Sequence, residues 1–226
     1  MGKQRTAIVF GMVLLGAGVV ATWVLRQRAR PTACPFGQRI FLDLPRPFLR
    51  REALLRLLAL APGERVLEVG PGTRYYTLEV AHHLEPGGQI DALDLQQAML
   101  DEMMGRAHAR GLSNVVPMQG DVQQIPFPDA TFDAAFLVAT LGEVPDRDQA
   151  LRDLRRVLKS GGRLIVGEGQ PDPHMVPLAA LRREAGAAGL HYERHEGGRL
   201  GYLARFRAGS RLPYPSWSAP IEESGT

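Results

Sequence analysis

Residues 65–74 read RVLEVGPGTR, and this stretch decides the fold. Its first half, Arg65–Val69, has the short apolar pattern of a buried strand. A turn with glycines at Gly70 and Gly72 follows, and a helical pattern covers residues 75–84. A glycine-rich turn between a strand and a helix lets a ligand approach the backbone, beside the free N–H groups of the helix. The stretch therefore predicts an α/β fold with a ligand site at the end of this strand.

The alternation of strand and helix continues along the chain. Further strand patterns cover residues 89–93, 114–119, 132–138 and 163–166, and helical patterns cover 47–60, 96–110, 147–158 and 177–188. Strands separated by helices form a mostly parallel sheet with helices on both faces. Two last strand patterns, 190–195 and 200–206, flank Gly197–Gly198 and predict an antiparallel hairpin. We therefore expect a Rossmann-like, doubly wound sheet of seven strands that ends in this hairpin.

The composition fits one folded domain with an additional segment. The chain has 226 residues, of which 45% are apolar and 23% are charged, so it is globular rather than disordered. The single cysteine, Cys34, excludes a disulfide framework and an all-cysteine zinc site. The histidines show no metal-ligand spacing, and we expect no metal.

The N-terminal part of the sequence contains an uncharged run of 19 residues, 7–25, AIVFGMVLLGAGVVATWVL. As a helix it would span roughly 28 Å, close to the hydrocarbon thickness of a bilayer. Trp23 suits the interface, and WVLRQRAR lacks the cleavage site of a signal peptide, which is the alternative. Three arginines follow the run, against Lys3 and Arg5 before it. We expect a retained single-pass membrane anchor, with the following domain in the cytoplasm.

Positive charge is concentrated in the same part of the chain. Residues 1–30 carry five basic residues and no acid, whereas residues 31–226 carry 22 basic and 24 acidic residues. A nearly neutral body predicts no nucleic-acid partner. We divide the chain into an anchor (1–30), a linker with a first helix (31–62), the main domain (63–208) and a flexible tail (209–226).

Acidic residues follow the next two predicted strands. Asp94 ends the pattern IDALD, 22 residues after Gly72, where a carboxylate can accept hydrogen bonds from ribose hydroxyls. Asp121 can accept from an exocyclic amine while Val122 packs on a purine, although a turn-forming Asp is the alternative. The dinucleotide pattern G-x-G-x-x-G is broken by Tyr75, and no phosphate-binding Gly-Lys-Ser/Thr follows.

The chain resembles class I S-adenosylmethionine-dependent methyltransferases of the type 11 group, which includes enzymes of ubiquinone and menaquinone biosynthesis. The resemblance covers nearly half of the chain and rests on five segments in family order, VLEVGPGTRYYTLEVA, IDALDLQQAML, GDVQQIPFPDATFDAAF, LGEVPD and LRDLRRVLKSGGRLIVGE. It implies S-adenosyl-L-methionine as the cofactor. The residues that it implies as cofactor-binding are Glu68, Gly70 and Gly72 on the methionine side, Asp94 at the ribose with the adjacent Leu95, Asp121 and Val122 at the adenine, and Leu137 and Val138 beside the sulfonium.

The resemblance further implies methyl transfer to a small acceptor. Because we expect a membrane anchor, we expect this acceptor to be lipid-like or apolar. A phenol or carbon acid can need a base, and the candidates are Glu143 and His174, after the fourth and fifth strands. Each also fits a structural role. Arg74 stands where the family often has a third glycine. A tethered binding protein with a vestigial pocket is therefore one alternative, and an NAD-linked oxidoreductase is another. The acceptor atom and the oligomeric state stay open.

Overall fold

The computed structural model describes residues 48–72 and 75–210. The strands of this part are β1 (Arg65–Val69), β2 (Gln89–Asp94), β3 (Val115–Gln119), β4 (Phe132–Val138), β5 (Leu158–Gly169), β6 (Leu190–Gly198) and β7 (Gly201–Ala208). Its α-helices are α2 (Arg51–Leu58), α3 (Thr77–His83), α4 (Gln97–Ala109), α5 (Arg147–Val157) and α6 (Leu178–Ala187). Two 3-10 helices, η2 (Val122–Gln124) and η3 (Leu141–Glu143), follow β3 and β4.

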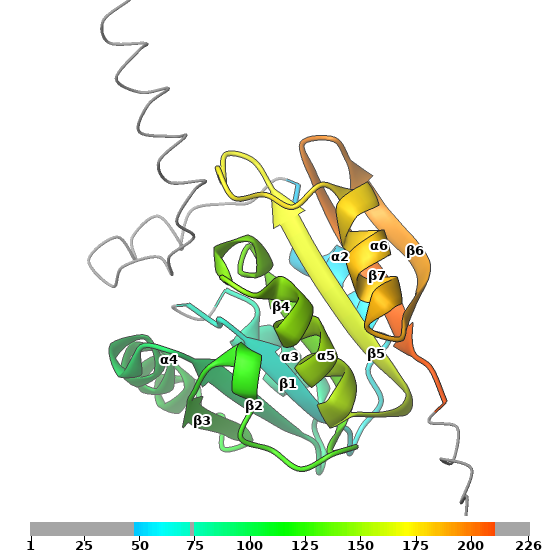
Figure 1. Ribbon diagram of the computed structural model, residues 1–226. Coiled ribbons are helices and arrows are strands. Elements are labelled where there is room, and N and C mark those ends of the chain that lie inside the picture. Colours follow the sequence, from blue (N-terminus) through cyan, green and yellow to red (C-terminus); the bar gives the residue numbers. More distant parts are fainter. Residues whose placement is uncertain (1–47, 73–74, 211–226) are drawn as a thin grey trace, which may run out of the picture.

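The strands form one seven-stranded sheet in the order β3-β2-β1-β4-β5-β7-β6 (Figure 1). β1 to β5 are parallel to one another, and β7 pairs antiparallel with both β5 and β6. The predicted seven-stranded Rossmann-like sheet and its terminal hairpin are confirmed. β1 lies between β2 and β4, so the strand order reverses there, and open α/β sheets bind ligands beside such a reversal.

Apolar side chains alternate between the two faces of the sheet and form two layers. Ala134, Phe136 and Val138 of β4 belong to the layer packed under α2, α3 and α4, whereas Ala135 and Leu137 belong to the layer under α5 and α6. Neighbouring residues of a strand point to opposite faces, so a strand covered on both sides must be apolar throughout. The continuous apolar pattern of β4 follows from this central position.

β5 is longer than the sequence predicted. Gly161–Gly162 indicated a turn and a strand starting at Arg163, but β5 begins at Leu158. Its register against β4 shifts between Phe132 and Ala134, which pair with Leu158 and Arg163. Gly161, at φ +73°, lies inside this irregularity. The two glycines therefore form a bulge within the strand instead of ending it.

Three predictions concern residues outside the described part of the chain. These are the membrane anchor over 1–30, most of the flexible tail over 209–226, and the side chain of Arg74. None of the helices in residues 48–72 and 75–210 combines the length and the apolar character needed to span a bilayer. The division of the chain into four regions stays a prediction.

Candidate functional site

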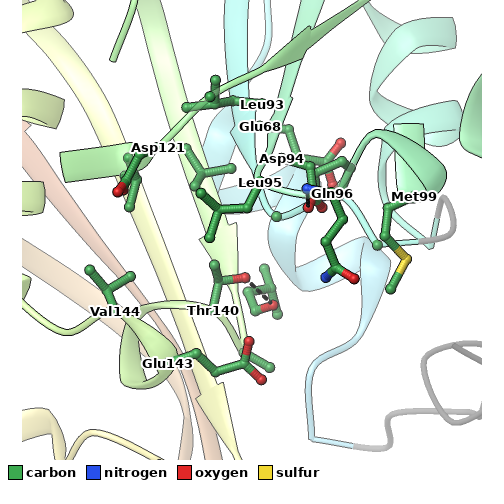
Figure 2. A pocket seen from close by; sticks show the side chains of 18 of the residues that line it. Glu68, Leu93, Asp94, Leu95, Gln96, Met99, Asp121, Thr140, Glu143 and Val144 are labelled. Atoms are coloured by element: carbon green, nitrogen blue, oxygen red, sulfur yellow. Dashed lines mark hydrogen bonds between the residues drawn. The ribbon is translucent and has the colours of Figure 1, made fainter. Parts of the chain in front are cut away.

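A pocket lies at the carboxyl ends of β1, β2 and β4, where the strand order reverses (Figure 2). Its walls come from the turns that follow these strands, from the start of η2 after β3, and from η3. The lining residues include Glu68–Gly72, Tyr75, Tyr76, Leu93–Gln96, Met99, Gly120–Gln123, Val138–Thr140 and Glu143–Pro145. Segments that are distant in the sequence thus meet around one cavity.

Gly70 allows the first of these turns to lie against the turn after β4. Its φ is +66°, and its N–H donates to the carbonyl of Leu93 at 2.9 Å. A Cβ on Gly70 would lie 2.6 Å from Oγ1 of Thr140, another lining residue. Both the backbone conformation and the close approach therefore require glycine.

Glu68 places a buried carboxyl at the base of the pocket. The residue is 2% exposed, and its Oε2 has no hydrogen-bond partner within residues 48–72 and 75–210. Burial raises the pKa of Glu68 to about 8, the nearby Thr77 hydroxyl lowers it, and the Asp94 carboxyl raises it further. At neutral pH this side chain is therefore mostly uncharged and offers an unused acceptor to a cationic ligand.

Two further acids line the pocket while holding their own turns. Asp94 Oδ1 accepts the Gln96 N–H at 2.9 Å at the start of α4. Burial raises the pKa of Asp94, against the effect of backbone N–H groups that include that of Gln96. Asp121 accepts the backbone and side-chain N–H groups of Gln123, both at 2.8 Å, and caps η2. The turn-forming role considered for Asp121 is present, and the residue also lines the pocket.

The structure brings together nearly all the residues singled out by the sequence. Those lining the pocket are Glu68, Gly70, Gly72, Asp94, Leu95, Asp121, Val122 and Glu143. Leu137 is not among the lining residues, because strand alternation directs it into the layer under α5 and α6. Its neighbour Val138, which was expected beside the sulfonium together with Leu137, does line the pocket. Thr140 was not anticipated, since only the close approach of Gly70 reveals its position.

The two candidate bases differ in position. Glu143 and Thr140 lie across the pocket from Asp94 and Gln96 (Figure 2). His174 does not line the pocket, and its backbone N–H donates to Asp172 Oδ1 at 2.7 Å. The geometry favours Glu143 over His174 as a group that meets a ligand. In the part of the chain described, no cluster of three or more His, Cys, Asp or Glu side chains could hold a metal ion.

Comparison with known proteins finds one family that matches part of the chain. Residues 67–166 match the sequence profile of a family described as "Methyltransferase domain". This part of the chain is therefore similar to a methyltransferase domain. Its cofactor is S-adenosyl-L-methionine, in agreement with the sequence-based expectation.

Curated relatives align with the same half of the chain. A demethylmenaquinone methyltransferase of Bacillus cytotoxicus is 34% identical over 118 residues, which are 52% of this chain and 50% of the relative. A ubiquinone/menaquinone biosynthesis C-methyltransferase of Teredinibacter turnerae is 38% identical over 121 residues, 53% of this chain and 49% of the relative. The match therefore spans about half the length of each relative.

Solved structures share the fold. A SAM-dependent methyltransferase from Aquifex aeolicus superposes with a TM-score of 0.71 at 24% identity, over 77% of this chain and 99% of its own. The [4+2]-cyclase SpnF superposes with a TM-score of 0.64 at 22% identity, over 70% of this chain and 79% of its own. The chain thus shares its fold with a protein named as a methyltransferase and with an enzyme named for another reaction.

The pocket fits the cofactor on two observations. S-adenosyl-L-methionine carries a sulfonium and an ammonium group, and the unpartnered Oε2 of Glu68 is an acceptor suited to positive charge. Gly70 has no side chain of its own, so at this turn the backbone itself can face the cavity.

Proposed function

We propose that the chain is an S-adenosyl-L-methionine-dependent methyltransferase acting on a small, apolar, quinone-like acceptor at a membrane. The observation that carries this proposal is the pocket, which joins the buried Glu68 carboxyl to an acid at the tip of the neighbouring strand. The similarity of residues 67–166 to a methyltransferase domain supports the reaction type.

The pocket residues suggest an orientation for the cofactor. Glu68 and the turn with Gly70 and Gly72 would hold the methionine part, because a buried carboxyl suits its ammonium group. Asp94 would accept hydrogen bonds from the ribose, with Leu95 beside it. Asp121 and Val122 would face the adenine, and Val138 would lie near the sulfonium, where Leu137 and Val138 were both expected.

The chemistry asked of the protein is mainly positioning. When bound, S-adenosyl-L-methionine supplies an electrophilic methyl group. The turns around the pocket would align the acceptor and keep water out. Glu143 would accept a proton from an acidic acceptor, since it lies across the cavity from Asp94.

Two observations support the class of acceptor. The similar relatives are named for demethylmenaquinone and for C-methylation in ubiquinone and menaquinone biosynthesis. The apolar run at 7–25 would keep the domain near a bilayer-dissolved acceptor and raise its local concentration. A quinol also carries phenolic protons, which give Glu143 a defined task.

The ribose role of Asp94 leads to a binding prediction. Asp94→Ala in the full chain should weaken binding of S-adenosylhomocysteine roughly 10- to 100-fold, as expected for losing hydrogen bonds to an acidic acceptor. Titration calorimetry measures the change. Asp101→Ala removes an exposed acid of α4, the helix that follows Asp94, and should bind as the wild type does. Unchanged affinity in Asp94→Ala would contradict the proposal that Asp94 binds the ribose.

The reaction itself can be tested with a defined acceptor. The full chain, given radiolabelled S-adenosyl-L-methionine and a reduced short-chain demethylmenaquinone in phospholipid vesicles, should place label on the quinol. A chain lacking residues 1–30 should bind S-adenosylhomocysteine equally well but methylate the vesicle-bound quinol more slowly. Tight cofactor binding with no label in the quinol or in extracted lipids would contradict the proposal and favour a binding protein.

A further inference from the structure

A second buried glutamate lies near the pocket but does not line it. Glu168, the penultimate residue of β5, is 0% exposed. Its Oε2 accepts the N–H of Val176 at 3.0 Å, in the loop that leads to α6. Its Oε1 is buried and has no hydrogen-bond partner in the described part of the chain. Burying a carboxyl oxygen without a hydrogen-bond partner costs free energy of folding, so such a group calls for a structural or functional explanation.

This carboxyl lies where two loops meet. The N–H of Gly142, in η3, is close enough to lower the pKa of Glu168. Gly142 also lies against the loop after β5, since a Cβ on Gly142 would be 2.1 Å from the carbonyl oxygen of His174. The backbone of η3 therefore packs directly on the loop after β5, and Glu168 is beneath both.

Charged and titratable groups surround Glu168 on every neighbouring element. Burial raises its pKa to about 8, and the carboxyls of Asp172 in its own loop and Glu143 in η3 add to the rise. From β7, Tyr202 pairs in register with Glu168 and donates to the Val176 carbonyl at 2.6 Å. Arg147 of α5 forms an ion pair with Glu184 of α6. The Glu168 carboxyl is close enough to contribute to the raised pKa of Arg147.

We propose that Glu168 is a positioning residue that joins the loop after β5 to η3 and thereby holds Glu143 at the acceptor side of the pocket. That Glu143 faces an acceptor rests on the proposed function, whereas the joining of the two loops by Glu168 does not. Glu168 itself touches neither cofactor nor acceptor. Its uncharged form is compatible with Glu143 and Asp172 nearby, whereas its ionised form repels both.

The joining of the loops is tested by hydrogen exchange on the full chain with S-adenosylhomocysteine. Glu168→Leu removes the acceptor of the Val176 N–H, and we expect at least tenfold faster exchange in peptides covering both residues 140–144 and 174–178. Glu168→Gln keeps an acceptor oxygen and should keep both regions protected. Glu184→Gln breaks the ion pair with Arg147 and should leave both peptides protected.

A pH series separates positioning from simple packing. When the loops open, Glu168 meets water and its pKa falls toward its ordinary value, so the closed form is favoured by protonation. Protection should therefore fall as pH rises toward 8, by up to about tenfold per pH unit, and then level off. Glu168→Gln should flatten this slope, and it serves as the decisive variant if Glu168→Leu does not fold.

Three results would overturn the proposal. They are faster exchange in only one of the two loops, an equal effect of Glu184→Gln, or an unchanged pH slope in Glu168→Gln. Methylation of the reduced short-chain demethylmenaquinone provides a separate readout, in which Glu168→Leu should lower kcat while the affinity for S-adenosylhomocysteine changes less than threefold. If the wild type methylates nothing, the exchange result still decides the role of Glu168.

Discussion

A Gly70→Val variant is expected to lose about 100-fold or more of its affinity for S-adenosylhomocysteine. At φ +66° a branched residue is strained, and its Cβ would lie 2.6 Å from Oγ1 of Thr140. Relief requires the turn after β1 to move away from the turn after β4, which opens the pocket between them. Titration calorimetry on the full chain measures the loss, and thermal unfolding reports whether the domain stays folded.

Gly63 supplies the matched control. It also has a positive φ, +81°, but a Cβ there would have no atom within 4 Å. Gly63→Ala should therefore cost a little stability and no affinity. Gly70→Ala combined with Thr140→Ala should regain part of what Gly70→Ala alone loses, because the clash is then removed. Equal losses in Gly63→Ala and Gly70→Ala would mean that backbone strain, and not the approach to Thr140, controls the pocket.

Cofactor binding should release a proton from Glu68. The pKa of this buried carboxyl is raised to about 8 in the free protein, so it is mostly uncharged at pH 7. The ammonium group of the ligand prefers the ionised form, and the fraction in that form grows tenfold per pH unit below 8. Affinity for S-adenosylhomocysteine should therefore rise by roughly tenfold per unit between pH 6 and 7.5. Calorimetry in buffers of different ionisation enthalpy should detect up to one proton released.

Glu68→Gln keeps the shape of the side chain and removes its titration. This variant should bind more weakly at pH 7.5 and release no proton from this position, so its affinity should vary little from pH 6 to 7.5. If the wild type shows no proton release, or if Glu68→Gln shows the same release, then Glu68 does not meet the positive charge of the ligand. The ammonium group would then have to be held elsewhere in the pocket.

Much of the fold could be predicted because its signals are local. β1 and β4 have the predicted bounds, since β1 lies between Glu64 and Gly70, and β4 follows Thr131 and ends two residues before Thr140. β5 was predicted too short, because the same glycines that end a strand elsewhere form a bulge here. Whether Gly161–Gly162 ends or bends the strand depends on pairing with β4, which is not a local property.

The candidate site was predictable wherever a residue ends a parallel strand. Asp94 and Asp121 follow β2 and β3, and the carboxyl ends of such strands meet at one edge of the sheet. Leu137 was expected at the pocket but does not line it. Its direction depends on which face of the sheet the odd-numbered residues of β4 occupy, and the sequence cannot decide this because both faces are apolar. Glu168 gave no signal, since its importance comes from burial and from the N–H of Val176.

The arrangement of the pocket separates two tasks along the chain. Apart from Val138 at the end of β4, the residues proposed to hold the methyl donor lie before residue 124, whereas Glu143 and the loop held by Glu168 come after β4. Substitutions in the later loops can therefore reshape the room left for an acceptor while the donor side keeps its form. Such a layout allows one nucleoside-holding half to serve acceptors of quite different size and acidity.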